Sequence, residues 1–422
     1  MALYTTADGI LGTHVTWNDV EEEMQKALGT TATFGEDKKV TNISDMKGFM
    51  SRIALIEPCW IGFTNEETLP EKFIVKISSQ LPYIEMTKLM DFGGEDIWNA
   101  ERLNNMGEAT RVFHNKEVAT YQIMMRENHP KIPLTKIYAA KPFEEENSLK
   151  AYIISEYIPN LYHIGMHDSI PAEDLLPIVQ ALAIFSAIGQ NLSEDETKYA
   201  RGANFLDMIF HQFMDETSIK RSETMMRNAF PEDYHEKVEQ MLKNNQDYYL
   251  NPKMLDNFKN TCNFFGYQPV LTHSDAWSAN FLCTKEGSKV NFKALIDFQT
   301  VSITTPAQDV ARLFASCLSA KDRREKAEYL LEEYYKTFVK ELNGNEVPYS
   351  LQNLKDSYQV YFPLMSCLVL PAIAPMLEHG HASDDEKEAM KNAAMEKMIG
   401  LLEDVIITHE SSMKKLPKYF QF

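Results

Sequence analysis

The chain is 422 residues long, with 44% hydrophobic and 24% charged residues and a formal net charge of −19. This composition is typical of a globular protein and excludes a disordered or fibrous architecture, while the length favours two lobes or domains. The negative charge disfavours nucleic acid and anionic lipid surfaces as partners. The five cysteines show no C-x-x-C spacing, which indicates reduced thiols in a cytoplasmic protein rather than a disulfide or zinc framework.

The predicted elements change in character along the chain. Residues 16–29 form a capped helix, 49–57 and 73–77 are strands, 108–127 is a helix without Gly or Pro, and a further strand ends at Pro159. Helical patterns follow over 171–260, short strands over 265–303, and helices over most of the remainder. This order predicts an α+β, two-lobed chain with a small β-rich N-lobe (1–157) and a large, mainly helical C-lobe (158–422).

No segment predicts insertion into a membrane. The N-terminus lacks the basic start and apolar block of a signal peptide, and no stretch reaches the roughly 18 apolar residues that span a bilayer. The nearest approach, residues 363–377, carries three prolines and is expected to be a buried helix or a cleft-lining segment. We also find no pattern that requires an obligate protein partner.

Polar residues stand among apolar ones in LTHSDAWSANFL, residues 271–282, with the spacing H-x-D-x-x-x-x-N. A second carboxylate, Asp297, ends the strand of the next predicted hairpin in the sequence D-F-Q. Phosphoryl transfer from a nucleotide needs metal ions and a cation on the phosphates, and a carboxylate that orients the attacking hydroxyl. Asn280 and Asp297 are oxygen ligands suited to Mg²⁺, and Asp275 is placed to accept the hydroxyl proton. His273 is expected to hold the loop as structural support.

Two alternatives to this interpretation of the motif remain open. In a purely structural one, His273 and Asp275 cap a turn and Asn280 satisfies a buried backbone group. In the other, His273 and Asp275 bind zinc, although no third His or Cys follows at ligand spacing. The downstream strand that ends in D-F-Q favours phosphoryl transfer over both.

The same mechanism predicts a lysine inside an early strand, and KFIVKIS places Lys76 there. Its acidic partner should come from the following helix, where Glu117 shares a helical face with apolar residues. A phosphate-covering turn should precede the lysine, and NISDMKGFMSRI offers Gly48 and Ser51 as nucleotide-binding residues. The structural alternatives are an edge-strand lysine, a solvated helix glutamate and an ordinary turn.

Two further positions complete the predicted site. The strand IISEYIP at the lobe boundary offers backbone groups at Glu156 and Ile158 to an adenine edge. Asp309 follows Asp297 by twelve residues and is expected to cap a helix or to hydrogen-bond back to the catalytic loop as structural support. This short run leaves no room for the activation segment of a protein kinase, so the expected acceptor is the hydroxyl of a small molecule.

With these residues in place, the chain resembles the choline-kinase-like (CHK) group of the aminoglycoside phosphotransferase and protein-kinase-like superfamily, and within it the nematode branch of the ecdysteroid-kinase-like proteins. The resemblance covers nearly the whole chain and rests on KGFMSRIALIE, FIVKIS, FHNKEVATYQ, HSDAWSANFL, LIDFQ and PAQDVARL. It implies a two-lobed protein-kinase-like fold that uses ATP and Mg²⁺, with Lys76 on the nucleotide phosphates and Glu117 as its partner. It also implies Asp275 as the catalytic base, and Asn280 with Asp297 on magnesium.

The sequence departs from that pattern in two places. Ser274 occupies a position where the wider fold often has glycine, and the segment before Lys76 is less glycine-rich than in protein kinases. Neither departure removes a catalytic group. By resemblance, the substrate would lie within residues 160–260 and 360–380, where Trp277 and aromatic and Met-rich helices form either an apolar pocket or simply core.

The predicted function is therefore an ATP-dependent kinase of a small-molecule hydroxyl, on a molecule that is steroid-like, lipid-like, a glycoside or an amino-alcohol. The main alternative is a pseudokinase that keeps the fold and acts as a nucleotide-binding or scaffold protein. A third alternative is a metal-dependent hydrolase that uses His273.

Overall fold

The computed structural model describes residues 2–44, 50–64, 68–89, 100–202, 204–212, 216–378 and 384–422. The chain divides into two compact units, neither of which is continuous in sequence. Unit 1 comprises Met1–Asn128, Leu134–Asn160 and Asp297–Gln299, and unit 2 comprises His129–Pro133, Leu161–Ile296 and Thr300–Phe422. Asp297 therefore belongs to the same unit as Lys76 and Glu117, although it lies far beyond residue 157 in the sequence.

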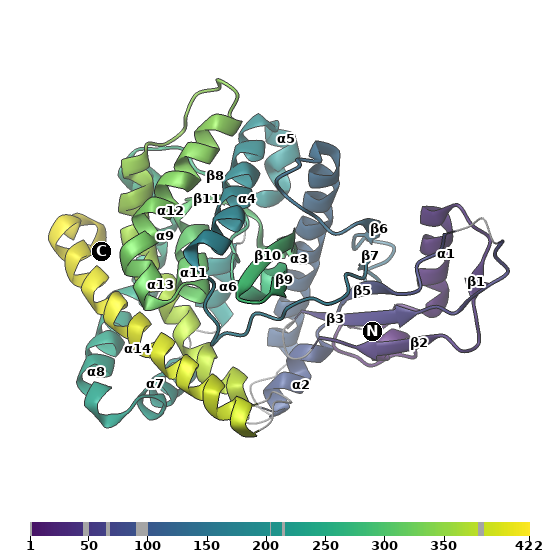
Figure 1. Ribbon diagram of the computed structural model, residues 1–422, viewed down its shortest axis with the longest axis horizontal. Helices are drawn as coiled ribbons and strands as arrows, with labels where there is room; N and C mark the ends of the chain where they lie inside the picture. Colours follow the sequence, from purple (N-terminus) through teal and green to yellow (C-terminus); the bar gives the residue numbers. More distant parts are fainter. Residues whose placement is uncertain are drawn as a thin grey trace. The chain divides into compact units, whose positions relative to one another are not determined.

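Unit 1 is built around a five-stranded antiparallel sheet with the strand order β2-β3-β5-β7-β6 (Figure 1). Its strands are β2 (Lys39–Asn42), β3 (Ser51–Glu57), β5 (Phe73–Ser78), β6 (Ile137–Lys141) and β7 (Tyr152–Glu156), and β1 (Thr33–Phe34) pairs separately with β4 (Trp60–Ile61). Its helices are α1 (Trp17–Leu28), α2 (Leu81–Leu89) and α3 (Ala100–Glu127). The strands predicted within 49–57 and 73–77 are β3 and β5, and the helix predicted over 108–127 is the C-terminal part of α3.

The first helix shows how local sequence sets the ends of an element. The hydroxyl of Thr16 accepts from the backbone N–H of Asp19, whose carboxylate accepts in return from the backbone of Thr16. This reciprocal capping box satisfies two N–H groups that the first turn would otherwise leave unpaired. Gly29 ends the helix with φ 65°, a left-handed conformation that glycine adopts without steric cost.

The two faces of the five-stranded sheet have different surroundings. Phe73, Val75 and Ile77 of β5 are fully buried in an apolar core that α1 completes. Successive side chains of a strand point to opposite faces, so Lys76 lies on the other face of the sheet, where its ammonium meets α3. The alternation of apolar residues in β5 thus directs one charged group away from the core and toward a helix.

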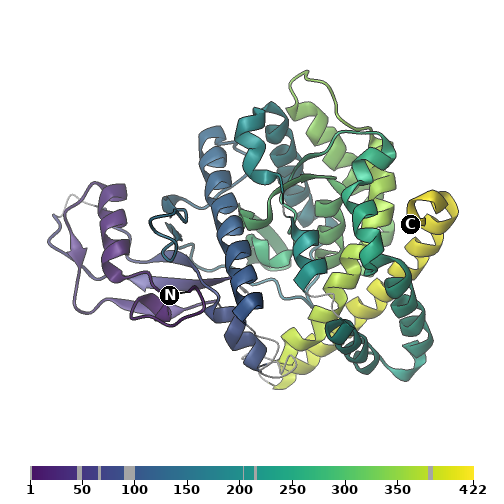
Figure 2. The same ribbon diagram turned by 180° about the vertical axis from the view of Figure 1, so that it is seen from behind.

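Unit 2 is mainly helical, and its described residues include four short strands. Its strands are β8 (Val270–Thr272), β9 (Phe281–Glu286), β10 (Lys289–Leu295) and β11 (Ser302–Thr304), paired as β8 with β11 and β9 with β10. Its helices are α4 (Ala172–Asn191), α5 (Glu194–Thr197), α6 (Phe205–Gln212), α7 (Glu216–Ala229), α8 (His235–Asn244), α9 (Leu255–Lys259), α10 (Thr261–Phe265), α11 (Ala307–Cys317), α12 (Ala320–Glu341), α13 (Leu351–Glu378) and α14 (Asp384–Lys415). Helix α13 packs against both α11 and α14, and α4 packs against α12 and β8 (Figures 1 and 2). The predicted α+β class, with a small β-rich part and a large helical part, is confirmed.

Within the described residues, one helix is long and apolar enough to cross a membrane, and it is α4 rather than the predicted nearest approach at 363–377, which lies within α13. The expectation that 363–377 comes nearest to a membrane span was wrong. Polar residues interrupt the apolar run of α4 in sequence, but they leave its mean hydropathy high. In the fold, 72% of the most apolar window of α4 is buried inside the chain. A helix that is apolar on all sides is expected at the centre of a large core, and α4 packs there against α12 and β8.

Candidate functional site

In unit 1, Lys76 and Glu117 form a closely bonded ion pair. Strand β5 lies between β3 and β7, so Lys76 is in the interior of the sheet rather than at its edge. Its Nζ donates to both carboxylate oxygens of Glu117, at 2.8 and 2.7 Å. Glu117 is only 1% exposed and projects from α3 between Phe113 and Tyr121, which are also buried. The helix therefore holds a carboxylate against the strand lysine within the protein interior.

Asp297 is the third member of this cluster. Its Oδ1 accepts from the Nζ of Lys76 at 2.7 Å, although 221 residues separate the two in sequence. The backbone of Asp297 has a φ of 66°, a left-handed conformation that is uncommon for aspartate. The ring of Phe298, the next residue, packs edge-on against Tyr121 of α3 at a centroid distance of 5.1 Å. Such strained backbone persists where the surroundings enforce it, often at functional sites, and the Phe298 ring is one such enforcing contact.

The cluster of Lys76, Glu117 and Asp297 carries one positive and two negative groups. Burial alone would lower the pKa of Lys76, but Asp297 and Glu117 together raise it, so its ammonium stays charged. Burial raises the pKa of Glu117 to about 7, and the charge of Asp297 acts in the same direction, while Lys76 opposes both. When both carboxylates are ionised, the cluster has one negative charge in excess, which a proton or a metal cation can neutralise.

His114 supports this cluster and was missed in the sequence analysis. It is buried and lies three residues before Glu117, on the same face of α3. Its Nε2–H donates to the carbonyl of Lys141 at 2.9 Å, and its Nδ1 accepts from the hydroxyl of Ser78 at 2.6 Å. Burial lowers the pKa of His114 to about 4, so the ring is neutral and links α3 to β5 and β6. The three-residue spacing from Glu117 was the signal that could have identified it.

In unit 2, the predicted catalytic loop follows β8 and passes through a 3₁₀ turn at Ser278–Asn280 into β9. His273 is fully buried; its Nε2–H donates to the carbonyl of Ile296 at 3.0 Å, and its Nδ1 accepts from the backbone N–H of Asp275 at 3.4 Å. The backbone N–H of Ile296 in turn donates to the carbonyl of Asn280 at 3.1 Å. Both backbone groups of the residue that precedes Asp297 are thus bonded to the loop.

Asp309 anchors the start of the same loop. Its two carboxylate oxygens accept from the backbone N–H groups of His273, at 2.8 Å, and Ser274, at 2.6 Å. Burial raises the pKa of Asp309 to about 6, against the opposing effects of His273 and of these hydrogen bonds. Of the two predicted roles, the structure has the hydrogen bonds back to the loop, because Pro306 is the N-cap position of α11 and no side chain caps it. Ser274 has a φ of 67°, a left-handed conformation that glycine adopts without steric cost.

Asp275 lies between an amide and a guanidinium. The Nδ2 of Asn280 donates to the backbone carbonyl of Asp275 at 2.8 Å and to its Oδ2 at 3.2 Å, which leaves the Asn280 side-chain oxygen as the atom able to coordinate a cation. The Nε of Arg312, on α11, is 2.7 Å from Oδ1 of Asp275. The N–H does not point at the oxygen, so this contact is an ion pair without a hydrogen bond. Arg312 was not among the predicted residues, although it is three residues after Asp309 on one helical face.

The remaining predicted nucleotide residues are less connected. Gly48 lies outside the described residues. Ser51 begins β3, is buried, and pairs in register with Ser78 of β5. Glu156 ends β7, where its Oε1 accepts from the backbone N–H of Lys136 at 2.7 Å, and Ile158 is partly exposed two residues later. These contacts of Ser51 and Glu156 are with residues other than Lys76, Glu117 and Asp297, although β3 pairs with the strand that carries Lys76.

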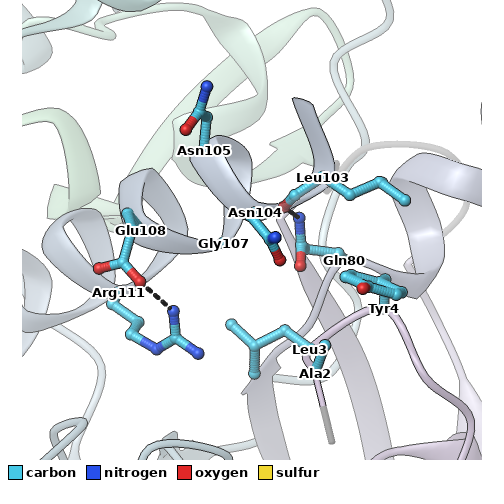
Figure 3. A pocket seen from close by; sticks show the side chains of 10 residues that line it. All are labelled: Ala2, Leu3, Tyr4, Gln80, Leu103, Asn104, Asn105, Gly107, Glu108 and Arg111. Atoms are coloured by element: carbon cyan, nitrogen blue, oxygen red, sulfur yellow. Dashed lines mark hydrogen bonds and ion pairs between the residues drawn. The ribbon is translucent and has the colours of Figure 1, made fainter. Parts of the chain in front are cut away.

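A cavity of about 220 Å³ lies in unit 1 beside the N-terminal part of α3 (Figure 3). Leu3, Gln80 and Gly107 line it, and the ion pair between Glu108 and Arg111, 2.8 Å long, forms part of its wall. Among the described residues, neither Lys76 nor the other predicted nucleotide-binding residues line this cavity. It is therefore separate from the residues on which the predicted chemistry depends.

Metal binding by His, Cys, Asp and Glu alone is not supported in the part of the chain that the structure describes, where no group of three or more such residues could hold an ion. A zinc site on His273 does not fit, because both ring nitrogens and its backbone N–H are bonded to the loop and to Asp309. Magnesium has different needs, since it keeps several waters and takes one or two protein oxygens together with substrate phosphates.

Comparison with known proteins finds a kinase-like nematode protein that is similar to this chain. It is 23% identical over 354 residues to "Uncharacterized kinase-like protein D1044.1" of Caenorhabditis elegans, a match that covers 81% of this chain and 87% of that protein. Among solved structures it is similar to the ethanolamine kinase Pv091845 of Plasmodium vivax, with 13% identity, a TM-score of 0.42, and coverage of 88% of this chain and 84% of that one. It is also similar to a microcompartment-associated aminopropanol kinase, with 10% identity, a TM-score of 0.44, and coverage of 93% and 98%. With TM-scores this low, the structural similarities say nothing of this chain's substrate.

The family model DUF1679, described as "Uncharacterized oxidoreductase dhs-27", matches residues 3–413. The predicted resemblance to a kinase-like nematode group is confirmed by this match together with the C. elegans relative. Because the family model spans nearly the whole chain, the chain belongs to the DUF1679 family.

Proposed function

We propose that the protein is an ATP-dependent phosphotransferase that moves the γ-phosphate to a hydroxyl of a small molecule. The observation that carries this proposal is the buried cluster in which Lys76 of β5 donates to Glu117 of α3 and to Asp297 of the D-F-Q sequence, all within 2.8 Å. Phosphoryl transfer in kinases depends on a strand lysine held by a helix glutamate and on an aspartate that binds the metal. Three residues from distant parts of the sequence meet here in that combination.

The charges of the cluster suit a nucleotide that arrives with a cation. With both carboxylates ionised, Lys76 is shared between Glu117 and Asp297, and one negative charge is in excess. A cation bound by Asp297 would remove that excess, and Lys76 would then be able to donate to phosphate oxygens while Glu117 keeps it in place. His114 holds the helix that carries Glu117 through its bonds to Ser78 and Lys141.

Asp275 is the proposed base that receives the proton of the acceptor hydroxyl. Its carboxylate is oriented by the amide of Asn280, and the loop beneath it is fixed by Asp309 and His273. We assign the magnesium ligands to Asn280, whose side-chain nitrogen is the atom bonded to Asp275, and to Asp297. Magnesium, when bound, would neutralise the charge that develops on the transferring phosphate.

The proposal also includes nucleotide contacts at the other predicted residues. Gly48 and Ser51 would cover the phosphates, and the backbone at Glu156 and Ile158 would meet the adenine edge. The cytoplasmic location, and the lack of nucleic-acid, membrane and obligate protein partners, remain predictions from composition.

The family description names an oxidoreductase, and the cofactor-binding features of such an enzyme can be compared with those of this chain. Dinucleotide-dependent enzymes bind their cofactor with G-x-G-x-x-G in a parallel βαβ unit. The sequence contains no G-x-G-x-x-G, and every strand pair among the described residues is antiparallel. These observations favour phosphoryl transfer over hydride transfer for this chain.

The test incubates the purified chain with ATP labelled in its γ-phosphate, Mg²⁺ and a metabolite extract, and follows transfer of label to an organic product. We expect transfer by the wild type and a loss of at least about a hundredfold in Asp275→Asn and in Asp297→Asn. Asp256→Asn, an exposed aspartate of unit 2, is the matched control and should retain full activity.

Three outcomes would contradict the proposal. Transfer of labelled phosphate that persists in both Asp275→Asn and Asp297→Asn would show that these two aspartates do not have the assigned roles. Nucleotide binding without transfer to any acceptor would favour the pseudokinase alternative, and reduction of NAD or NADP by the wild type would favour an oxidoreductase.

A further inference from the structure

Arg312 has an unusual setting beside the proposed base. Its guanidinium carbon lies 4.6 Å from the centre of the Phe205 ring and 5.8 Å from that of the Trp277 ring, and its Nε is 2.7 Å from Oδ1 of Asp275. The Arg312 side chain is 12% exposed and that of Asp275 13%. A cation of the chain itself is thus held among two aromatic rings and a carboxylate, largely out of water.

These are the groups with which proteins recognise ammonium ligands. A quaternary or primary ammonium binds over the faces of tryptophan, tyrosine or phenylalanine, strengthened by a nearby carboxylate. An amino-alcohol acceptor carries its positive charge a few bonds from the hydroxyl, so that charge would have to lie close to Asp275 when the hydroxyl does. Around Asp275, Phe205 and Trp277 already face the guanidinium of Arg312.

The neighbouring carboxylates on the same elements are also occupied. Asp309, one turn before Arg312 on α11, accepts from the backbone of His273 and Ser274. Asp207, two residues after Phe205 on α6, pairs with the ammonium of Lys259 at 2.8 Å. Neither of these two carboxylates is available to pair with a second cation. A second cation placed beside Arg312 would therefore lie close to a like charge in a poorly solvated site.

We propose that Arg312 is a specificity-determining residue that occupies the position an acceptor's ammonium group would take. The proposal rests on the assigned role of Asp275 as the acceptor base. It narrows the acceptor classes, since the hydroxyl belongs to a molecule without a positive charge near it, and amino-alcohols such as choline are excluded. The guanidinium then faces an uncharged or anionic part of the acceptor.

The experiment measures binding without nucleotide, by equilibrium dialysis of the full chain against labelled choline. Arg312→Gln removes the cation, Arg312→Met removes it and keeps an apolar stem between the rings, and Arg312→Lys keeps a positive charge. The matched ligand is 3,3-dimethylbutan-1-ol, which has the shape of choline with a carbon atom in place of the charged nitrogen.

We expect choline to bind the two neutral variants about tenfold more tightly than it binds the wild type or Arg312→Lys. The affinity for 3,3-dimethylbutan-1-ol should not rise in parallel. Thermal melting identifies a variant that fails to fold, and the other neutral variant then decides the result. Choline affinity that is no greater in the folded neutral variants than in the wild type overturns the proposal. Because no nucleotide is present, this outcome is independent of whether the chain transfers phosphate.

Discussion

Replacement of Glu117 by glutamine tests the charges of the buried cluster. Glu117 is 1% exposed, and burial together with Asp297 raises its pKa from 4.5 to about 7. In the unfolded chain the pKa returns to its ordinary value, so the folded state binds the proton more tightly. The resulting stability is fully present below pH 4.5 and is lost as the pH rises through about 7. The difference in pKa corresponds to about 3 kcal/mol in total, most of which falls between pH 5 and pH 8.

The variant Glu117→Gln has no carboxyl to titrate at this position. Its free energy of unfolding, relative to that of the wild type, should therefore rise by about 2 to 3 kcal/mol from pH 5 to pH 8. His114, with its pKa lowered to about 4, and Asp309, with its pKa raised to about 6, are present in both proteins, so their contributions cancel in the difference. Lys76 keeps its proton over this range in the folded state, where its pKa is raised, and in the unfolded state, where its pKa has the ordinary value of 10.5.

The assay is urea unfolding followed by circular dichroism at several pH values between 5 and 8. Glu108→Gln is the matched control, since Glu108 lies on the same helix with its side chain 76% exposed, and its curve should run parallel to that of the wild type. Parallel curves for Glu117→Gln and the wild type would refute the reasoning, because they would mean that Glu117 is no easier to protonate in the folded chain than in the unfolded one.

Two further predictions concern the packing around the loop. Gly189→Ala would place a Cβ 2.3 Å from that of Leu271, in the strand before the loop, and should lower the free energy of urea unfolding by about 2 kcal/mol; an unchanged value would mean that α4 moves aside freely. Lys397→Met removes the buried ammonium that donates to the carbonyl of Ser316 in the last turn of α11, and should cost about 2 kcal/mol. The exposed Lys391→Met on the same helix is its control, and an equal effect in both variants would contradict this role.

The local sequence was sufficient to predict structural features that depend on residues close together in the chain. The cap at Thr16 and the end at Gly29 follow from residues within one turn, and both occur as predicted. Alternation along β5 was enough to predict that Lys76 would leave the apolar face, and a four-residue spacing was enough to put Glu117 on the inner side of α3. The H-x-D-x-x-x-x-N spacing and the following hairpin likewise identified the loop between β8 and β9.

Only the tertiary structure decided which of these residues meet. The bond from Lys76 to Asp297 crosses 221 residues, and no local periodicity encodes how a strand and a distant turn approach each other. For Asp309 the sequence left open a helix cap or a bond to the loop, and in the fold its carboxylate accepts from the backbone N–H groups of His273 and Ser274 in the loop. Arg312 was not predicted for the same reason. Its proposed role depends on its contact with Phe205, which forms only through the packing of α6, α11 and the catalytic loop. Short-range spacing thus specifies which side of an element a residue occupies, and the packing of distant elements specifies its partner.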